Sequence, residues 1–170
     1  MSDKILVAYT TAAGSTAEVA EAIGQELSKG DGTVDVVRAK DVTDLGPYRA
    51  VIVGSGIRAG KIYKDTLAFL GSHQDSLSEV PVAYFVVCLT MQDDTEENRC
   101  EVETYVDQMR QQAPQVQPVG VGLFAGKLDY KTLAFPMRWI LKAMKAEEGD
   151  YREWDKIEAW VDDLRPALVR

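Results

Sequence analysis

Hydrophobic residues recur along this chain in two alternating patterns. Five short apolar runs, bounded by glycine, proline or polar residues, predict β-strands at residues 5–9, 34–38, 50–54, 82–88 and 119–124. Several of these runs are almost continuously apolar, which is typical of strands covered on both faces. Between the runs, apolar residues return every three or four positions and predict amphipathic helices.

Strands that alternate with helices imply a parallel sheet with helical crossovers, so we predict one doubly wound α/β domain over residues 1–170. Three predicted helices have a clear apolar face. Those faces carry Val19, Ala20, Ile23 and Leu27 in the first, Val102, Tyr105, Val106 and Met109 in a later one, and Ile157, Trp160, Val161 and Leu164 in the last.

Composition narrows the class of protein. A formal net charge of −8 argues against general nucleic-acid binding. No apolar run is long enough to span a bilayer and no signal segment opens the chain, so we expect a cytoplasmic protein. His73 is the single histidine, and we predict no metal site. Cys88 and Cys100 match no zinc spacing, and we expect both to be small buried hydrophobes.

The segment that follows the first predicted strand reads Thr-Thr-Ala-Ala-Gly-Ser-Thr over residues 10–16. The first amides of a helix lack internal partners and attract anions, and hydroxyl groups add donors at the same place. Because the loop has no lysine, we predict that neutral donors hold a phosphate monoester there. A nucleoside-triphosphate loop needs a Lys-Ser/Thr pair, and a dinucleotide loop needs three glycines. An ordinary capped turn is the alternative.

Two further segments fall where a doubly wound sheet binds ligands, beyond the carboxyl ends of its strands. Residues 54–61, Gly-Ser-Gly-Ile-Arg-Ala-Gly-Lys, form a glycine-rich loop whose backbone could lie against a flat ring. After the fourth predicted strand, Leu89 and Met91 offer apolar walls and Thr90 offers a polar contact. We therefore expect the three loops to form one binding site.

Nearly the whole chain, these three loops included, resembles the flavodoxin-like proteins. The stretch from Tyr9 to Thr16 is similar to that family's loop for the phosphate of flavin mononucleotide (FMN), although Ala12 and Ala13 stand where hydroxyl residues are usual. The resemblance implies a flavodoxin-like fold, a three-layer sandwich around a five-stranded parallel sheet of strand order 2-1-3-4-5. It also implies FMN as the cofactor.

The resemblance further implies which residues contact FMN. They are Thr10, Thr11, Ala12, Ala13, Gly14, Ser15 and Thr16 around the phosphate, and Ser55, Gly56, Ile57, Arg58, Ala59, Gly60, Leu89, Thr90 and Met91 around the isoalloxazine ring. We identify no catalytic general base.

Two segments resemble a narrower group, the quinone-dependent protoporphyrinogen dehydrogenases of the same superfamily. One is Gly-Ser-Gly-Ile-Arg-Ala-Gly after the third strand, and the other begins with Ala-Gly-Lys-Leu-Asp-Tyr at residue 125. Arg58 and Lys61 stand in the ring-side loop, where a nearby cation would favour an anionic reduced flavin. This arrangement predicts a flavin that accepts electrons from an organic substrate, unless both side chains point into solvent.

A basic amphipathic insertion follows the fifth strand at about residues 127–150. Residues 127–145 carry a local net charge of +4, against −8 for the whole chain. On a helical projection, Phe135 and Trp139 lie away from the apolar face. Such a helix could rest on the inner face of an anionic membrane as a peripheral contact, or approach a large flat anion. The alternative is that its aromatic residues pack under a neighbouring loop.

The resemblance implies an FMN-dependent oxidoreductase that oxidises protoporphyrinogen IX, a tetrapyrrole, and reduces a quinone. Two other functions remain open: a non-enzymatic flavodoxin that carries electrons to redox partner proteins, and an NAD(P)H-quinone reductase. A phosphorelay receiver is excluded because it needs acidic residues at the end of the first strand, where Thr10 and Thr11 stand. The sequence does not indicate an oligomeric state.

Overall fold

A computed structural model describes residues 4–12, 14–30, 32–128, 139, 143 and 149–168 of the chain. The elements follow in the order β1 (Lys4–Thr10), α1 (Ser15–Ser28), β2 (Val34–Arg38), the 3-10 turn η1 (Ala39–Asp41), β3 (Tyr48–Arg58), β4 (Lys61–Ile62), α2 (Lys64–Ser72), α3 (Gln74–Ser78), β5 (Val82–Cys88), the 3-10 turn η2 (Leu89–Gln92), α4 (Glu96–Gln112), β6 (Gly120–Ala125), β7 (Lys127–Leu128), β8 (Gly149–Asp150) and α6 (Trp154–Leu168).

The long strands form one parallel sheet in the order β2-β1-β3-β5-β6, the order expected for the five predicted strands. Their carboxyl ends meet at one edge, because Thr10 pairs with Ser55, Gly56 with Val87, and Cys88 with Ala125. The segments that leave these ends are the first loop, the β3–β4 turn, η2 and the connection to β7. The sheet therefore brings the predicted site segments to one side of the molecule.

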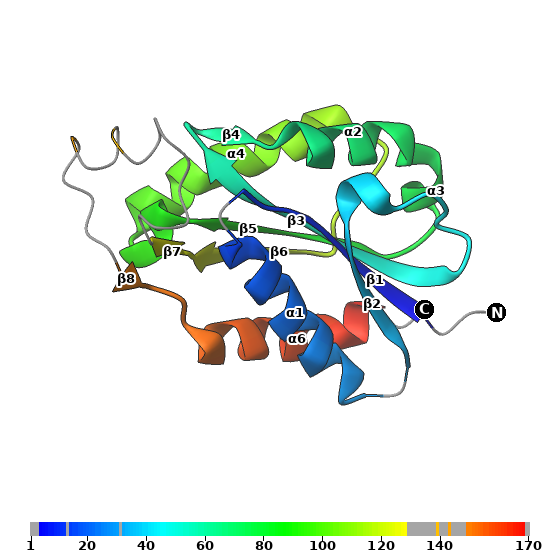
Figure 1. Cartoon of the computed structure of the whole chain (residues 1–170). Coiled ribbons are helices and arrows are strands. Elements are labelled where there is room, and N and C mark those ends of the chain that lie inside the picture. Colours follow the sequence, from blue (N-terminus) through cyan, green and yellow to red (C-terminus); the bar gives the residue numbers. More distant parts are fainter. Residues whose placement is uncertain are drawn as a thin grey trace.

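Helices cover both faces of the sheet and give the predicted three-layer sandwich (Figure 1). On one face α1 and α6 bury Val19, Ile23 and Ile157 against β1, β3 and β5. On the other face α2 and α4 bury Phe69 and Val106 in a second apolar cluster. The apolar faces predicted from the sequence are the ones that these helices bury, and they fix how each helix lies on the sheet.

The predicted end of the third strand was wrong. Residues 55–58 were expected in a loop, but β3 runs on to Arg58 and then turns back into the antiparallel strand β4. Ser55 and Gly56 stay extended because they pair with Val86 and Val87 of β5, a partnership that local sequence does not reveal. The sheet thus has a sixth, short strand beyond the five predicted.

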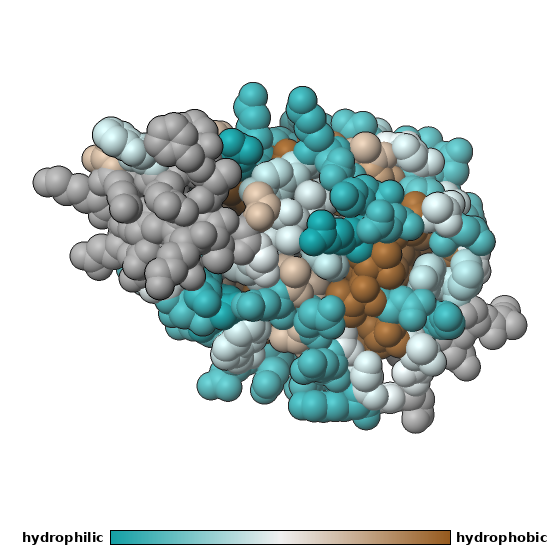
Figure 2. Space-filling model, viewed as in Figure 1, coloured by the Kyte–Doolittle hydropathy of each residue, from teal (hydrophilic) through white to brown (hydrophobic). Residues whose placement is uncertain are grey.

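Figure 2 shows hydrophobic surface gathered near the edge strand β2, whose Val34, Val36 and Val37 are only partly buried. Cys88 is buried as predicted, but Cys100 is exposed on α4, because it falls outside the apolar face of that helix. Within the described residues, no helix is long and apolar enough to cross a membrane.

Candidate functional site

The first loop joins β1 to α1 at the sheet edge. Gly14 precedes the helix with a φ of 93°, and a side chain placed there would meet nothing within 4 Å, so the loop is open above it. Its amide donates to Thr11 Oγ1 at 3.0 Å. The Glu18 amide makes a bond back to the Gly14 carbonyl, so the amides of residues 15–17 precede the regular helical bonding. Neutral donors that suit an anion thus gather here.

Two neighbouring glycines let other strands approach this loop closely. A methyl group on Gly56 of β3 would lie 3.0 Å from Thr16 Oγ1, and one on Gly126, just after β6, would lie 3.7 Å from Ser15 Oγ. Thr16 is 2% exposed, whereas Ser15 is half-buried. Ser15 is therefore the hydroxyl of the two that remains accessible to a ligand. Thr10 has its hydroxyl bonded to Thr66 of α2 at 2.8 Å.

The second predicted loop is a tight hairpin between β3 and β4. Arg58 pairs with Lys61, and the two turn residues Ala59 and Gly60 both have positive φ, at 51° and 73°. Two consecutive residues with positive φ are characteristic of the turns that match the twist of a hairpin. Arg58, Ala59 and Lys61 are exposed, and Gly60 is half-buried. Both predicted cations therefore lie at the surface beside the carboxyl edge of the sheet.

Helix α4 holds this hairpin with one side chain. The Gln108 amide nitrogen donates to the Gly60 carbonyl at 2.9 Å, and its oxygen accepts from the Ile62 amide at 3.0 Å. The ring of Tyr105 lies under Gly60. At the base of the hairpin, Ser55 Oγ is 3.3 Å from the Tyr63 amide and accepts its hydrogen. The hairpin is thus fixed at its turn and at its root.

The third predicted loop is the turn η2. Leu89 and Thr90 are half-buried, but Met91 is 4% exposed and belongs to the apolar cluster under α4. Asn98 Nδ2 donates to the Thr90 carbonyl at 3.2 Å and to the Asp93 carbonyl at 2.8 Å. The Asn98 side chain thereby links the start of α4 to η2 and to the segment between them.

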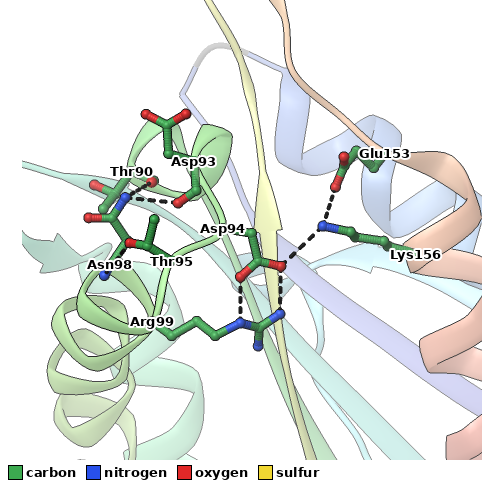
Figure 3. A network of polar contacts seen from close by, with 8 residues as sticks. All are labelled: Thr90, Asp93, Asp94, Thr95, Asn98, Arg99, Glu153 and Lys156. Carbon is green, nitrogen blue, oxygen red and sulfur yellow. Dashed lines mark hydrogen bonds and ion pairs between the residues drawn. The ribbon is translucent and has the colours of Figure 1, made fainter.

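Asp94 ties this segment to the C-terminal helix (Figure 3). Arg99 donates to both carboxylate oxygens, at 2.5 and 2.8 Å, and Lys156 of α6 donates to one of them at 3.1 Å. Hydrogen bonds from Arg99 and Lys156 lower the pKa of Asp94 to about 2. Lys156 also pairs with Glu153 at 2.6 Å. Asp94, Glu153 and Lys156 line a shallow hollow beside β6, together with Met91, Leu123, Phe124 and Ala125.

The predicted insertion leaves and re-enters the domain through a short antiparallel pair, with Lys127 opposite Asp150 in β7 and β8. Arg152 anchors the returning chain. Its guanidinium donates to Asp150 at 2.7 and 2.6 Å, reaches Glu18 of α1, and lies 4.7 Å from the ring centre of Trp154. Trp139 of the insertion is 68% exposed. Ala13, and residues 129–138, 140–142 and 144–148, lie outside the described residues.

The described residues contain no group of three or more histidine, cysteine, aspartate or glutamate side chains placed to hold a metal ion. Burial raises the pKa of the Cys88 thiol to about 11, so that it stays protonated at neutral pH. The chemistry available from the described side chains at this edge is therefore hydrogen bonding and charge.

A model of the flavodoxin domain family matches residues 6–155. The chain belongs to this family. Among curated proteins, the flavodoxin domain is 29% identical to a protoporphyrinogen IX dehydrogenase (quinone) from Leishmania major, over 96% of this chain and 75% of that protein. It is 24% identical to the protein of the same name from Escherichia coli K12, over 95% of this chain and 94% of that one.

Solved structures agree on the fold of this flavodoxin domain. Oxidised flavodoxin 2 from Bacillus cereus aligns with a TM-score of 0.61 and 20% identity, over 96% of this chain and 98% of that one. A flavodoxin from the domain Archaea aligns with a TM-score of 0.59 and 20% identity, over 98% and 99% of the two chains. The predicted resemblance and the flavodoxin-like fold are thus confirmed.

Several residues that shape the site were missed from the sequence. Gln108 bonds to the backbone of Ile62, 46 positions away, and Arg152 pairs with Glu18, 134 positions away. Asn98 bonds to the Thr90 carbonyl 8 positions away. Nothing in the local sequence of these three residues marks them as part of the site. Gly126 carried a usable signal, since a glycine directly after a strand often permits close approach of another backbone or side chain. Gln108 holds the β3–β4 hairpin and Asn98 holds η2, whereas Arg152 anchors the chain that returns from the insertion.

Proposed function

We propose that this protein binds FMN and oxidises protoporphyrinogen IX, with a quinone as the electron acceptor. The observation that carries the proposal is the first loop, which is open above Gly14 and brings the amides of residues 15–17 and the half-buried Ser15 hydroxyl together at the start of α1. A helix start without a neighbouring loop lysine suits a phosphate monoester held by neutral donors. Bound flavin supplies hydride and electron transfer, which no side chain here can provide.

The chain's own residues would serve this cofactor in distinct ways. Thr11 and Ser15, with the amides of residues 15–17, would hold the phosphate. The hairpin of Arg58 and Lys61 would place positive charge beside the ring. The half-buried Leu89 and Thr90 would border its other side. No side chain is assigned as a general base.

The names of the two curated relatives support the choice of substrate, because they align with nearly the whole chain. A non-enzymatic electron carrier is the second candidate. The net charge of −8 favours it, since acidic surfaces suit docking to redox partners. The two functions differ in one measurable respect: only the enzyme turns over a porphyrinogen.

The test is an absorbance spectrum of the purified protein, followed by anaerobic assay with protoporphyrinogen IX and a soluble quinone. We expect bound oxidised flavin and porphyrin formation that requires both the protein and the quinone. Flavin binding without porphyrin formation would favour the carrier. A protein that takes up no flavin in the presence of excess FMN would refute the proposal at its base.

A paired substitution tests the phosphate site. Ser15→Ala removes the accessible hydroxyl and should weaken FMN binding by about 1–2 kcal/mol, the usual effect of losing a hydrogen bond to a charged group. Ser28→Ala makes the same chemical change at the other end of α1, where the hydroxyl donates to the Gly24 carbonyl. Equal FMN affinities in the two variants would contradict the assignment of the phosphate to the first loop.

A further inference from the structure

The β3–β4 hairpin has two faces of opposite character. Ile57 and Ile62 are directly opposite each other, and both pack on the apolar cluster under α4. Side chains alternate along a strand, so the next pair, Arg58 and Lys61, projects from the other face. These two cations are exposed and directly opposite each other, on the same side of the hairpin.

Two features of this hairpin act against stability. Like charges directly opposite in an antiparallel pair repel each other. Ala59 adopts a φ of 51°, a left-handed conformation that its side chain disfavours. Among the described residues no carboxylate lies within ion-pair distance of Arg58 or Lys61, so no direct ion pair offsets the repulsion. Left-handed strain at a non-glycine residue is a feature that clusters at functional sites.

The hairpin also lies where a ligand at the sheet edge could reach it. Thr10, the last residue of β1, pairs with Ser55, and β3 continues past that point to Arg58, an overhang of about 10 Å. Gln108 holds the turn on α4 through two hydrogen bonds. Arg58 and Lys61 therefore lie on a hairpin that is held in place by hydrogen bonds and extends past the end of β1.

We propose that Arg58 and Lys61 form a recognition site for an organic substrate that carries two carboxylates. This inference rests on the proposed function, whose substrate has two propionate groups. The proposed donors for the cofactor's phosphate are at the start of α1, so the hairpin cations beside the ring are not needed for the phosphate and are available to the substrate. An arginine fork and a lysine charge side by side suit two carboxylates. They also supply local attraction for an anion on a protein of net charge −8.

Binding of protoporphyrin IX to the FMN-loaded protein tests the site without requiring turnover. The diacid is compared with its dimethyl ester, which lacks both charges, by quenching of protein fluorescence. Arg58→Gln and Lys61→Gln should each weaken diacid binding about 10-fold, as expected for loss of a charged hydrogen bond, and leave ester binding unchanged. Lys64→Gln is the matched control, because it removes an exposed charge at the start of α2, outside the hairpin.

Stability gives a second and opposite readout. Since each substitution removes the repulsion between Arg58 and Lys61, both variants should unfold at a higher urea concentration than the wild type. A merely structural role for either side chain would lower that midpoint instead. A rise in stability together with a loss of diacid affinity is the combination that the proposal requires.

Other outcomes separate this inference from the proposed function. Diacid binding that is absent from the wild type, or unchanged in both variants, would overturn the dicarboxylate site. A loss of FMN affinity with no selective loss of diacid binding would also overturn it, because the cations would then serve only the cofactor. If diacid binding depends on the hairpin but porphyrinogen is not oxidised, the site stands and the proposed enzyme activity falls. If porphyrinogen is oxidised equally well by the wild type and by both variants, the proposed enzyme activity stands and the dicarboxylate site falls.

Discussion

Replacing Gly56 by alanine tests whether the close contact between β3 and the first loop shapes the site. A methyl group there would lie 2.9 Å from Tyr63 Cε2 and 3.0 Å from Thr16 Oγ1. Carbon atoms prefer separations of about 3.5–4.0 Å, so the Tyr63 ring must retreat by roughly 0.6–1 Å. Thr16 is 2% exposed and has little room to move.

The magnitude follows from two opposing effects. Overpacking a tight site costs about 1–3 kcal/mol, and exchanging glycine for alanine inside a strand returns about 0.5–1 kcal/mol. We expect Gly56→Ala to lower the free energy of unfolding by about 1 kcal/mol. Because Thr16 lies beside Ser15 in the first loop, FMN affinity should fall by about 10-fold, which corresponds to about 1.4 kcal/mol.

Urea unfolding and FMN titration of the same preparations measure both effects. Gly71→Ala is the control, because its methyl group would meet only the end of the Gln112 side chain, which can swing away. In helix α2 that change should stabilise the protein by about 0.5–1 kcal/mol and leave FMN binding unaltered. A Gly56→Ala protein with wild-type stability and wild-type FMN affinity would refute the reasoning. Lost stability alone would show that Tyr63 yields and Thr16 does not.

Two further predictions concern stability. The pKa of Asp94, lowered to about 2 by Arg99 and Lys156, means that its ion pairs stabilise the fold above about pH 4 and lose that effect as pH falls toward 2. With allowance for solvent screening, Asp94→Asn should destabilise the protein by about 1 kcal/mol at pH 7, and a deficit in urea unfolding that persists unchanged at pH 2.5 would contradict this. Ala59→Gly should relieve about 1–2 kcal/mol of left-handed strain and lose about 0.4–1 kcal/mol to chain entropy, which leaves a modest gain. Gly60→Ala should do the opposite, and thermal melts that show the same sign for both would count against the strained turn.

The fold could be predicted from the sequence because its signals are local. The strands Val34–Arg38 and Val82–Cys88 have the predicted bounds, and the apolar faces of α1, α4 and α6 are the buried ones. Each signal depends on residues within a few positions of one another, such as a continuous apolar run or a repeat of three and four. Local propensity and tertiary packing agree in these elements.

The site was predicted less completely because its geometry depends on distant partners. Ser55 and Gly56 look like a loop but remain extended through pairing with β5. Arg-Ala-Gly-Lys lacks the Asn-Gly signal of a tight hairpin, so the local sequence does not predict β4, whose Ile62 amide bonds to Gln108 46 positions away. The individual contacts predicted for FMN remain predictions. The sequence therefore predicted which edge of the sheet holds the site. The hydrogen bonds of Gln108 and Asn98 that orient its loops are evident only in the structure.

The β7–β8 pair has a consequence for how this protein can vary. Because Lys127 and Asp150 are held opposite each other, the chain between them starts and finishes at neighbouring points, and the parallel sheet bears no tension from its length. The entropy of closing such a loop grows only slowly, by about 0.6 kcal/mol for each doubling. We therefore expect that residues 129–148 can be exchanged, lengthened or shortened to a two-residue turn without loss of the fold. Substrate specificity could then change in this segment, beside the sheet edge, while the core stays the same.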